Sequence, residues 1–187
     1  MNASSPRIPP LHPEEFTDEQ KELVGPWSVL NFSRVLARHP SLYRVFVPVV
    51  EKVIRYTDLP PRDREVLVIR TLAQCNETYE ADHHADIAGK CGMSAAEIAA
   101  VKEGAGDGLS AFDLQLINAA DELLRDKFIS AMTWKKLAER YTTLQLMEVV
   151  GLVGCYTTMA MVTKTFEIQI EGSEATTENL AALRQYT

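Results

Sequence analysis

Apolar residues recur along most of the chain at the three- and four-residue intervals that place them on one face of a helix. The clearest series are Val29, Phe32 and Leu36, followed by Leu42, Val45, Phe46, Val49, Val50 and Val53. Signals for helices follow one another, and signals for strands do not. The pattern therefore predicts an all-α fold.

Proline, glycine and capping residues divide this pattern into separate helices. Pro60 and Pro61 favour a helix start, since proline suits the first helical turn. The following helix is expected to run from Tyr79 to about Cys91 and to end with Gly92 at the C′ position. Further starts are predicted at Ser94, which forms a capping box with Glu97, and at Ser110, Thr133 and Thr142.

The length of 187 residues suits a single domain with polar ends. Residues 1–13 contain four prolines and are predicted to form an extended arm. Residues 14–170 form the helical domain, and residues 171–187 form a polar tail with room for a short helix around 178–185.

Composition excludes several classes of function. The 19 basic and 26 acidic residues leave a net charge of −7, which disfavours nucleic acid as a partner. Three cysteines without a Cys-x-x-Cys pair argue against a disulfide framework and against a local zinc site. The first residues lack the apolar core of a secretory signal, so a cytoplasmic protein is expected.

The apolar segment from Leu144 to Val162 approaches the length of a membrane span. It contains Gln145 and Glu148, which would be costly in lipid, so we interpret it as a buried helix and expect no membrane partner. Because the helix is apolar on nearly every side, it needs burial on nearly every side. One layer of helices in a chain of this size does not readily supply that burial, so a homo-oligomer is expected.

Glu80 and His84 are four residues apart and share one face of the predicted helix. A carboxylate beside an imidazole raises the pKa of the histidine and orients its ring, which suits general acid–base chemistry. Glu65 lies near the start of the preceding helix, and the short connection predicts that the two helices are antiparallel neighbours. Glu65, Glu80 and His84 are then able to surround one cavity. The alternative is a solvated helix face.

The chain also resembles the carboxymuconolactone decarboxylase and AhpD-like alkylhydroperoxidase superfamily. The specific motifs are Leu59-Pro60-Pro61 with Glu65, Tyr79-Glu80 with His84, and Gly92-Met93-Ser94 with Glu97. Ile8-Pro9-Pro10, Asn31-Phe32, the segment from Leu36 to Pro40, and Tyr156 also match. The resemblance implies an AhpD-like helical bundle that assembles into dimers, trimers or hexamers.

One departure from the superfamily pattern distinguishes between the peroxidase and the decarboxylase branches. The alkylhydroperoxidases have a glutamate, a Cys-x-x-Cys pair, and a histidine four residues after the second cysteine. In this chain the cysteine positions fall on Glu77 and Glu80, so the thiolate that a peroxidase cycle needs is absent from both. The decarboxylase branch also lacks these cysteines and has a glutamate four residues before the histidine. A peroxidase-related antioxidant protein is therefore the less favoured alternative.

The resemblance implies a cofactor-independent lyase, a decarboxylase acting on a carboxylated aromatic-derived or lactone-like small molecule. His84 protonates the enolate-like intermediate, Glu80 orients the imidazole, and Glu65 is a second acid–base group. Ring opening by the same groups is a related option. Candidates for substrate binding are Tyr79, Trp27, Phe32, Tyr156 and Cys75. The alternative is that the aromatic residues are core and that Cys75 is an inert buried thiol.

Two other hypotheses remain. Glu80 and His83 have the spacing of half a di-iron site, but the four histidines provide no second copy, so no metal or other cofactor is expected. The second hypothesis is a non-catalytic helical protein that binds a ligand or forms an oligomer. It predicts that Glu65, Glu80 and His84 do not converge, or that structural ion pairs occupy them.

Overall fold

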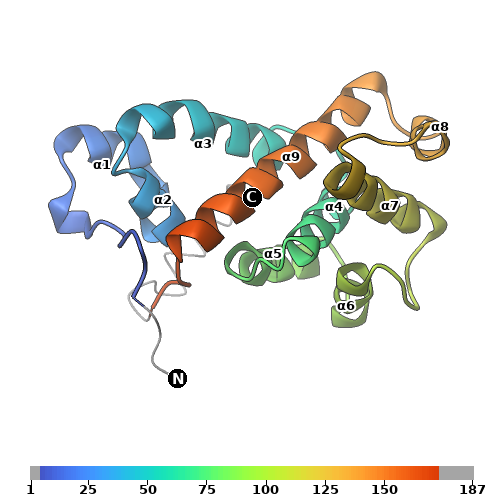
Figure 1. Cartoon of the computed structure of the whole chain (residues 1–187), viewed down its shortest axis with the longest axis horizontal. Helices are drawn as coiled ribbons and strands as arrows, with labels where there is room; N and C mark the ends of the chain where they lie inside the picture. Colours follow the sequence, from blue (N-terminus) through green and yellow to red (C-terminus); the bar gives the residue numbers. More distant parts are fainter. Residues whose placement is uncertain (1–4, 173–187) are drawn as a thin grey trace. The chain divides into compact units, whose positions relative to one another are not determined.

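The computed structural model describes residues 5–172, and all regular secondary structure within that range is helical (Figure 1). The helices are α1 (Asp18–Val24), α2 (Asn31–Leu36), α3 (Pro40–Arg55), α4 (Pro61–Gln74), α5 (Tyr79–Lys90), α6 (Ala95–Glu103), α7 (Ala111–Asp126), α8 (Ala131–Ala138) and α9 (Thr143–Phe166), with 3-10 turns η1 (Pro13–Glu15) and η2 (Gly25–Val29). The all-α fold predicted from the sequence is confirmed. The short helix expected around residues 178–185 lies outside the described residues.

The chain divides into two compact units. The central unit, Tyr56–Ala160, contains α4 to α8 and most of α9. The terminal unit combines the described residues up to Arg55 with those from Met161 onward. Both unit boundaries lie inside the range 14–170 that the sequence assigned to one helical domain.

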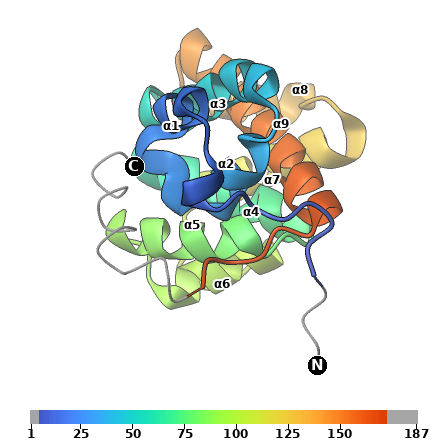
Figure 2. The ribbon, with the colours of Figure 1, turned by 90° about the vertical axis from the view of Figure 1, so that its left-hand side faces the viewer.

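The core of the central unit is built around α4, which packs against α5, α6 and α7 (Figures 1 and 2). Every residue from Asp63 to Leu72 is buried. Burial of a polar side chain is costly unless a partner satisfies it, so the charged residues of this stretch need partners on the surrounding helices. Asp63, for example, accepts a hydrogen bond from the hydroxyl group of Tyr141 at 2.7 Å.

Arg70 joins α4 to α7 and to the end of α6. Its Nε and one terminal nitrogen donate to the two carboxylate oxygens of Asp121 at 2.7 and 2.8 Å, and its other terminal nitrogen donates to the carbonyl oxygen of Lys102 at 2.6 Å. Gly104 follows α6 with a φ of +86°, and a Cβ atom there would lie 2.7 Å from the guanidinium carbon. A glycine at this position therefore provides both the left-handed backbone and the space that Arg70 occupies.

Local capping signals predicted most helix starts correctly, with one error. Ser94 and Ser110 cap α6 and α7 as expected, each accepting from the backbone N–H three residues later. The predicted start at Thr133 is wrong, because Ser130 caps α8 and accepts from the backbone N–H of Thr133. Glu122 of α7 accepts hydrogen bonds from the backbone and the side chain of Ser130, and this contact between α7 and the start of α8 holds the cap in place.

In the terminal unit, η2 packs against both α1 and α2, and α1 and α2 each contact α3. Arginines hold the proline-rich arm: Arg38 donates to the carbonyl oxygen of Pro9 at 2.8 Å, and Arg34 donates to that of Leu11. The backbone N–H of Arg7 donates to the carbonyl oxygen of Phe166 at 3.0 Å. The described part of the extended arm is therefore anchored through its backbone.

Among the described helices, α9 is long and apolar enough to cross a membrane by length and composition, and half of its most apolar window is buried within the protein. The core helix of a soluble protein passes the same test. The exposed side includes Leu144, Met147 and Val150, at 63, 66 and 43 % exposure. The burial expected on nearly every side is thus present on only part of the helix surface.

We expect the substitution Arg70→Met to lower the free energy of unfolding by about 3 kcal/mol, because it leaves the Asp121 carboxylate without its buried partner. Urea unfolding followed by circular dichroism measures the change. The control is Lys136→Met, which removes an exposed pair with Glu139 and should leave stability nearly unchanged. Equal effects of the two substitutions would contradict the structural role of Arg70.

We also expect light scattering at micromolar concentration to give a multiple of the 20.9 kDa chain mass, because the exposed apolar side of α9 needs a cover. Met147→Glu should shift the distribution toward the monomer. Met132→Glu is the matched control, since Met132 on α8 is 76 % exposed and lies outside that face. A wild-type monomer would refute the expectation.

Candidate active site

Three hydrogen bonds join four buried side chains of the central unit into a continuous chain. Arg64 Nε donates to Glu65 Oε1 at 2.7 Å, and Glu65 Oε2 lies 2.7 Å from His84 Nδ1. His84 Nε2 lies 2.7 Å from the hydroxyl oxygen of Tyr156. Glu65 and Tyr156 are 0 % exposed and His84 is 3 % exposed. The chain links α4, α5 and α9.

The connection between α4 and α5 brings Glu65 and His84 together. It is a tight turn in which Asn76 has a φ of +49° and Glu77 donates its backbone N–H to the carbonyl oxygen of Leu72. Cys91, at the end of α5, lies close enough to Glu65, near the start of α4, for that carboxylate to raise its pKa. The two helices therefore run antiparallel, as the sequence predicted.

Glu77 determines where α5 begins. One carboxylate oxygen accepts from the backbone N–H of Tyr79 at 3.0 Å, and the other accepts from that of Glu80 at 2.9 Å. These N–H groups have no partner within the helix, and a carboxylate at a helix N-terminus also interacts favourably with the helix dipole. Glu77, one of the two positions where the peroxidases have cysteine, is thus a helix-capping residue here.

The charges in the hydrogen-bonded chain follow from the pKa shifts of its members. Burial alone would raise the pKa of Glu65, but His84 and Arg64 together hold it below its ordinary value. Burial, with the charges of Glu65 and Glu80, raises the pKa of Tyr156 well above its ordinary value. Glu65 is therefore a carboxylate that only accepts, so Nδ1 of His84 carries a hydrogen. With a neutral imidazole, the phenol of Tyr156 donates to Nε2.

Glu80 does not have the position that the sequence suggested. The imidazole nitrogens of His84 bond to Glu65 and Tyr156, so Glu65 has the orienting role expected of Glu80. The sequence placed Glu80 near His84 because both lie on one face of α5. The carboxylate that is hydrogen-bonded to Nδ1, however, comes from the neighbouring helix α4. Glu80 is 8 % exposed and lies near Cys155 and Tyr156 of α9. Burial and the charge of Glu80 raise the pKa of Cys155 to about 12.

The residues proposed for substrate binding fall into different surroundings. Tyr156 belongs to the hydrogen-bonded chain. Tyr79 is buried and its ring packs edge-on against His83, with ring centroids 5.1 Å apart. Cys75 is the C-cap of α4 and is half-buried. Trp27 and Phe32 belong to the terminal unit, where Trp27 donates to Glu51 at 3.2 Å and the ring of Phe32 packs near that of Phe46.

Sequence reasoning missed Arg64, Glu77 and Cys91 as neighbours of the site. No spacing rule marks Arg64, whereas an acidic residue just before a helix start was a usable signal for Glu77. Among residues 5–172, no group of three or more His, Cys, Asp or Glu side chains is placed to hold a metal ion. What the arrangement offers chemically is proton transfer at His84 and Tyr156, supported by the Glu65 carboxylate.

Comparison with known proteins relates this arrangement to one family. Residues 40–120 match the model of the carboxymuconolactone decarboxylase family. The chain does not match any of the curated proteins. Among solved structures, it resembles a Cys-to-Ala variant of the debrominase Bmp8 in complex with 2,3,4-tribromopyrrole, with a TM-score of 0.66, 13 % identity, and coverage of 100 % of each chain.

At that level of identity the structural likeness shows the fold alone, and the fold agrees with the family match. Residues 40–120 include α4 and α5, which carry Glu65 and His84. The resemblance found in the sequence is confirmed, because residues 40–120 match the model of the carboxymuconolactone decarboxylase family.

Proposed function

We propose that the protein is a cofactor-independent lyase in which His84 is the acid–base centre. Its substrate is a carboxylated aromatic-derived or lactone-like small molecule, and its reaction is decarboxylation. The observation that carries this proposal is the buried chain Glu65–His84–Tyr156, in which each ring nitrogen of His84 has a partner at 2.7 Å. The match of residues 40–120 to the carboxymuconolactone decarboxylase family supports the substrate class.

The chemistry begins when the carbon–carbon bond to the substrate carboxylate breaks. Carbon dioxide leaves, and the bonding electrons delocalise into the substrate as an enolate-like anion. His84 in its imidazolium form donates from Nε2 to the oxygen of Tyr156, which leaves the phenol proton free for the substrate carbon. As the phenol gives up that proton, it takes the one on Nε2. The overall step consumes one proton, which water returns to His84.

The two carboxylates have separate roles in this scheme. Glu65 accepts from Nδ1 of His84 and so fixes the orientation of the imidazole ring. Glu80 lies near Tyr156 and helps keep its pKa high, so the phenol passes a proton on and does not persist as a phenolate. Since Tyr156 and His84 are buried, substrate reaches them only after neighbouring side chains move.

Two of the three thiols of the central unit, Cys91 and Cys155, give little support to peroxidase chemistry. The positions of the peroxidase cysteines are Glu77 and Glu80. Burial raises the pKa of Cys91 and of Cys155, and nearby carboxylates add to the rise, so both stay protonated near neutral pH. Because a thiolate is the reactive form, neither cysteine is suited to attack a peroxide.

The second candidate is a non-catalytic helical protein. The complete burial of the hydrogen-bonded side chains favours this candidate. Glu65 and Tyr156 have no exposed surface, and Glu65 accepts from Arg64 as well as from His84. A fully satisfied buried polar network also suits a structural role, because it helps to specify a unique packing. Measured turnover separates the two candidates.

The experiment that tests the proposal measures carbon dioxide release and product mass from a panel of unsaturated carboxylated lactones and carboxylated aromatic acids. The wild-type protein is expected to turn over at least one member. The His84→Gln variant, with circular dichroism confirming its fold, provides the blank. Release by His84→Gln at the wild-type rate, or no release from any member of the panel by the wild-type protein, would favour the non-catalytic candidate.

On the substrate so identified, we expect His84→Gln to lower turnover by roughly 100-fold or more, because it removes the acid–base group. His83→Gln is the matched control on the same helix. Its ring packs against Tyr79 and should leave turnover near the wild-type value. If His83→Gln abolishes turnover and His84→Gln does not, the assignment of the site is wrong.

The lowered pKa of Glu65 predicts how stability depends on pH. Its stabilising contribution is present above the ordinary glutamate pKa of about 4.3 and is lost as the pH falls through the lower folded-state value. We expect Glu65→Gln to lower the free energy of unfolding by about 3 kcal/mol at pH 7, with the gap from the wild type narrowing below pH 4. Urea unfolding at a series of pH values measures this gap. A gap that is independent of pH would show that Glu65 is not ionised in the folded protein.

A further inference from the structure

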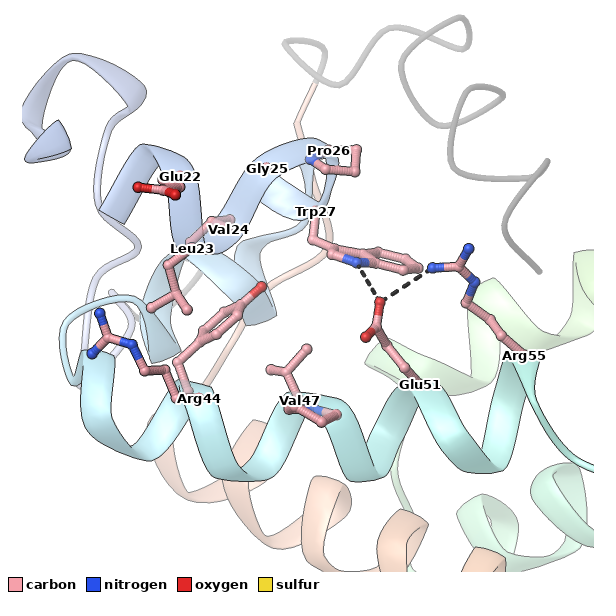
Figure 3. A pocket seen from close by; sticks show the side chains of 12 residues that line it. Glu22, Leu23, Val24, Gly25, Pro26, Trp27, Arg44, Val47, Glu51 and Arg55 are labelled. Atoms are coloured by element: carbon pink, nitrogen blue, oxygen red, sulfur yellow. Dashed lines mark hydrogen bonds and ion pairs between the residues drawn. The ribbon is translucent and has the colours of Figure 1, made fainter. Parts of the chain in front are cut away.

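A pocket of about 390 Å³ lies in the terminal unit, between α3 and the segment formed by α1 and η2 (Figure 3). Its size is within the range of small-molecule sites in proteins. Apolar side chains provide much of its lining, namely Leu23, Val24, Pro26, Trp27, Val47 and Pro48. The residues of the pocket all belong to the terminal unit, so it is distinct from the Glu65–His84–Tyr156 chain of the central unit.

The charged groups at this pocket are of both signs and largely paired. Glu51 Oε1 accepts from the indole N–H of Trp27 and from Arg55, each at 3.2 Å, and Figure 3 shows both donors directed at that carboxylate. The guanidinium of Arg55 also lies 5.9 Å from the centre of the Trp27 ring. Arg44 forms an ion pair with Glu19. These pairs leave little net charge to attract an ionic ligand.

Tyr43 is the polar residue of the pocket that the protein leaves unsatisfied. It is 2 % exposed, and its hydroxyl group has no hydrogen-bond partner among the described residues. Burial raises its pKa, so the group remains a hydrogen-bond donor. The nearby hydroxyl of Ser33 has a smaller, opposite effect on that pKa, but the two groups are not placed for a hydrogen bond of ordinary geometry. A buried donor without an acceptor is unfavourable, and a bound oxygen atom would satisfy it.

We infer that this pocket binds a neutral, planar ring compound with a carbonyl oxygen. The carbonyl accepts a hydrogen bond from Tyr43, and the ring packs among the aromatic and proline side chains. The pairing of both arginines disfavours an anion, since an anion would have to displace Glu51 or Glu19 from its arginine. With Glu22 included, the charged residues that line the pocket sum to zero, so a cation gains no net attraction either. Flat apolar surfaces of Trp27 and Pro26 suit a ring. The inference does not depend on the function proposed for the central unit.

The two tryptophans of the chain allow a direct test in one spectrum. Acetophenone, a neutral aromatic ketone, is titrated into the full-length ¹⁵N-labelled protein, and the two indole N–H signals are followed by NMR. A Trp134→Phe variant assigns the signals, and Trp134, on α8 of the central unit, is the internal control. We expect a saturable shift of the Trp27 signal with no shift of the Trp134 signal. No saturable shift at Trp27, or an equal shift of both signals, would overturn the inference.

The role of the Tyr43 hydroxyl is tested with Tyr43→Phe, which keeps the ring. Binding of acetophenone should weaken roughly three- to tenfold, the range for loss of one hydrogen bond. α-Methylstyrene, which has a CH₂ group in place of the carbonyl oxygen, should bind the wild type and Tyr43→Phe equally. Benzoate should bind more weakly than acetophenone. Equal binding of acetophenone to both proteins, or tighter binding of benzoate, would contradict the proposed ligand chemistry.

Thermal unfolding of the ligand-free proteins gives an independent readout. Removing a hydroxyl that has no partner should leave the Tm of Tyr43→Phe unchanged or slightly higher than that of the wild type. A clear fall in Tm would mean that the hydroxyl has a partner within the folded protein. That result would remove the basis of the inference even if acetophenone binds.

Discussion

The structure depends on the burial of one carboxylate. Glu65 has no exposed surface, and an ionised group in such a place is stable only if donors surround it. Arg64 and His84 are these donors, and His84 in turn bonds to Tyr156. Because the bonds cross from α4 to α5 and then to α9, satisfying this single charge fixes the register of three helices. The same bonds hold the imidazole in one tautomer, so the structural constraint and the proposed chemistry are one arrangement.

The other charged residues of α4 show the same principle on different neighbours. Asp63 accepts from Tyr141 and pairs with Arg140, whereas Arg70 bonds to Asp121 of α7. Apolar contacts alone discriminate poorly among similar packing arrangements of a helix that is buried on every side. Directional bonds from α4 to different partners remove that ambiguity, since each needs its own partner at a set position. The buried charges therefore specify which neighbour lies on which side of α4.

Sequence reasoning succeeded where the deciding interaction is local. Ser94 and Ser110 cap their own helices, and the short turn after α4 makes α5 its antiparallel neighbour. It failed where a residue from another helix determines the hydrogen-bond partner. The four-residue spacing from Glu80 to His84 could not show that Glu65 is the residue bonded to Nδ1. Nor could it show that Tyr156, 72 residues after His84, is bonded to Nε2. The cap of α8 depends on a contact with another helix, since Ser130 donates to Glu122 of α7. Trp27 and Tyr156, which the sequence grouped as candidates for substrate binding, lie in different units.

The capping role of Glu77 has a consequence for how chemistries can interchange on this fold. A cysteine at position 77 would remove the carboxylate that both Tyr79 and Glu80 donate to, and a thiol is a poor substitute acceptor. Installing a Cys-x-x-Cys pair would therefore loosen the start of the very helix that presents His84. A change of this kind requires a new cap for α5 at the same time. A variant that gains the cysteines before it gains a new cap for α5 would therefore be less stable than the present protein.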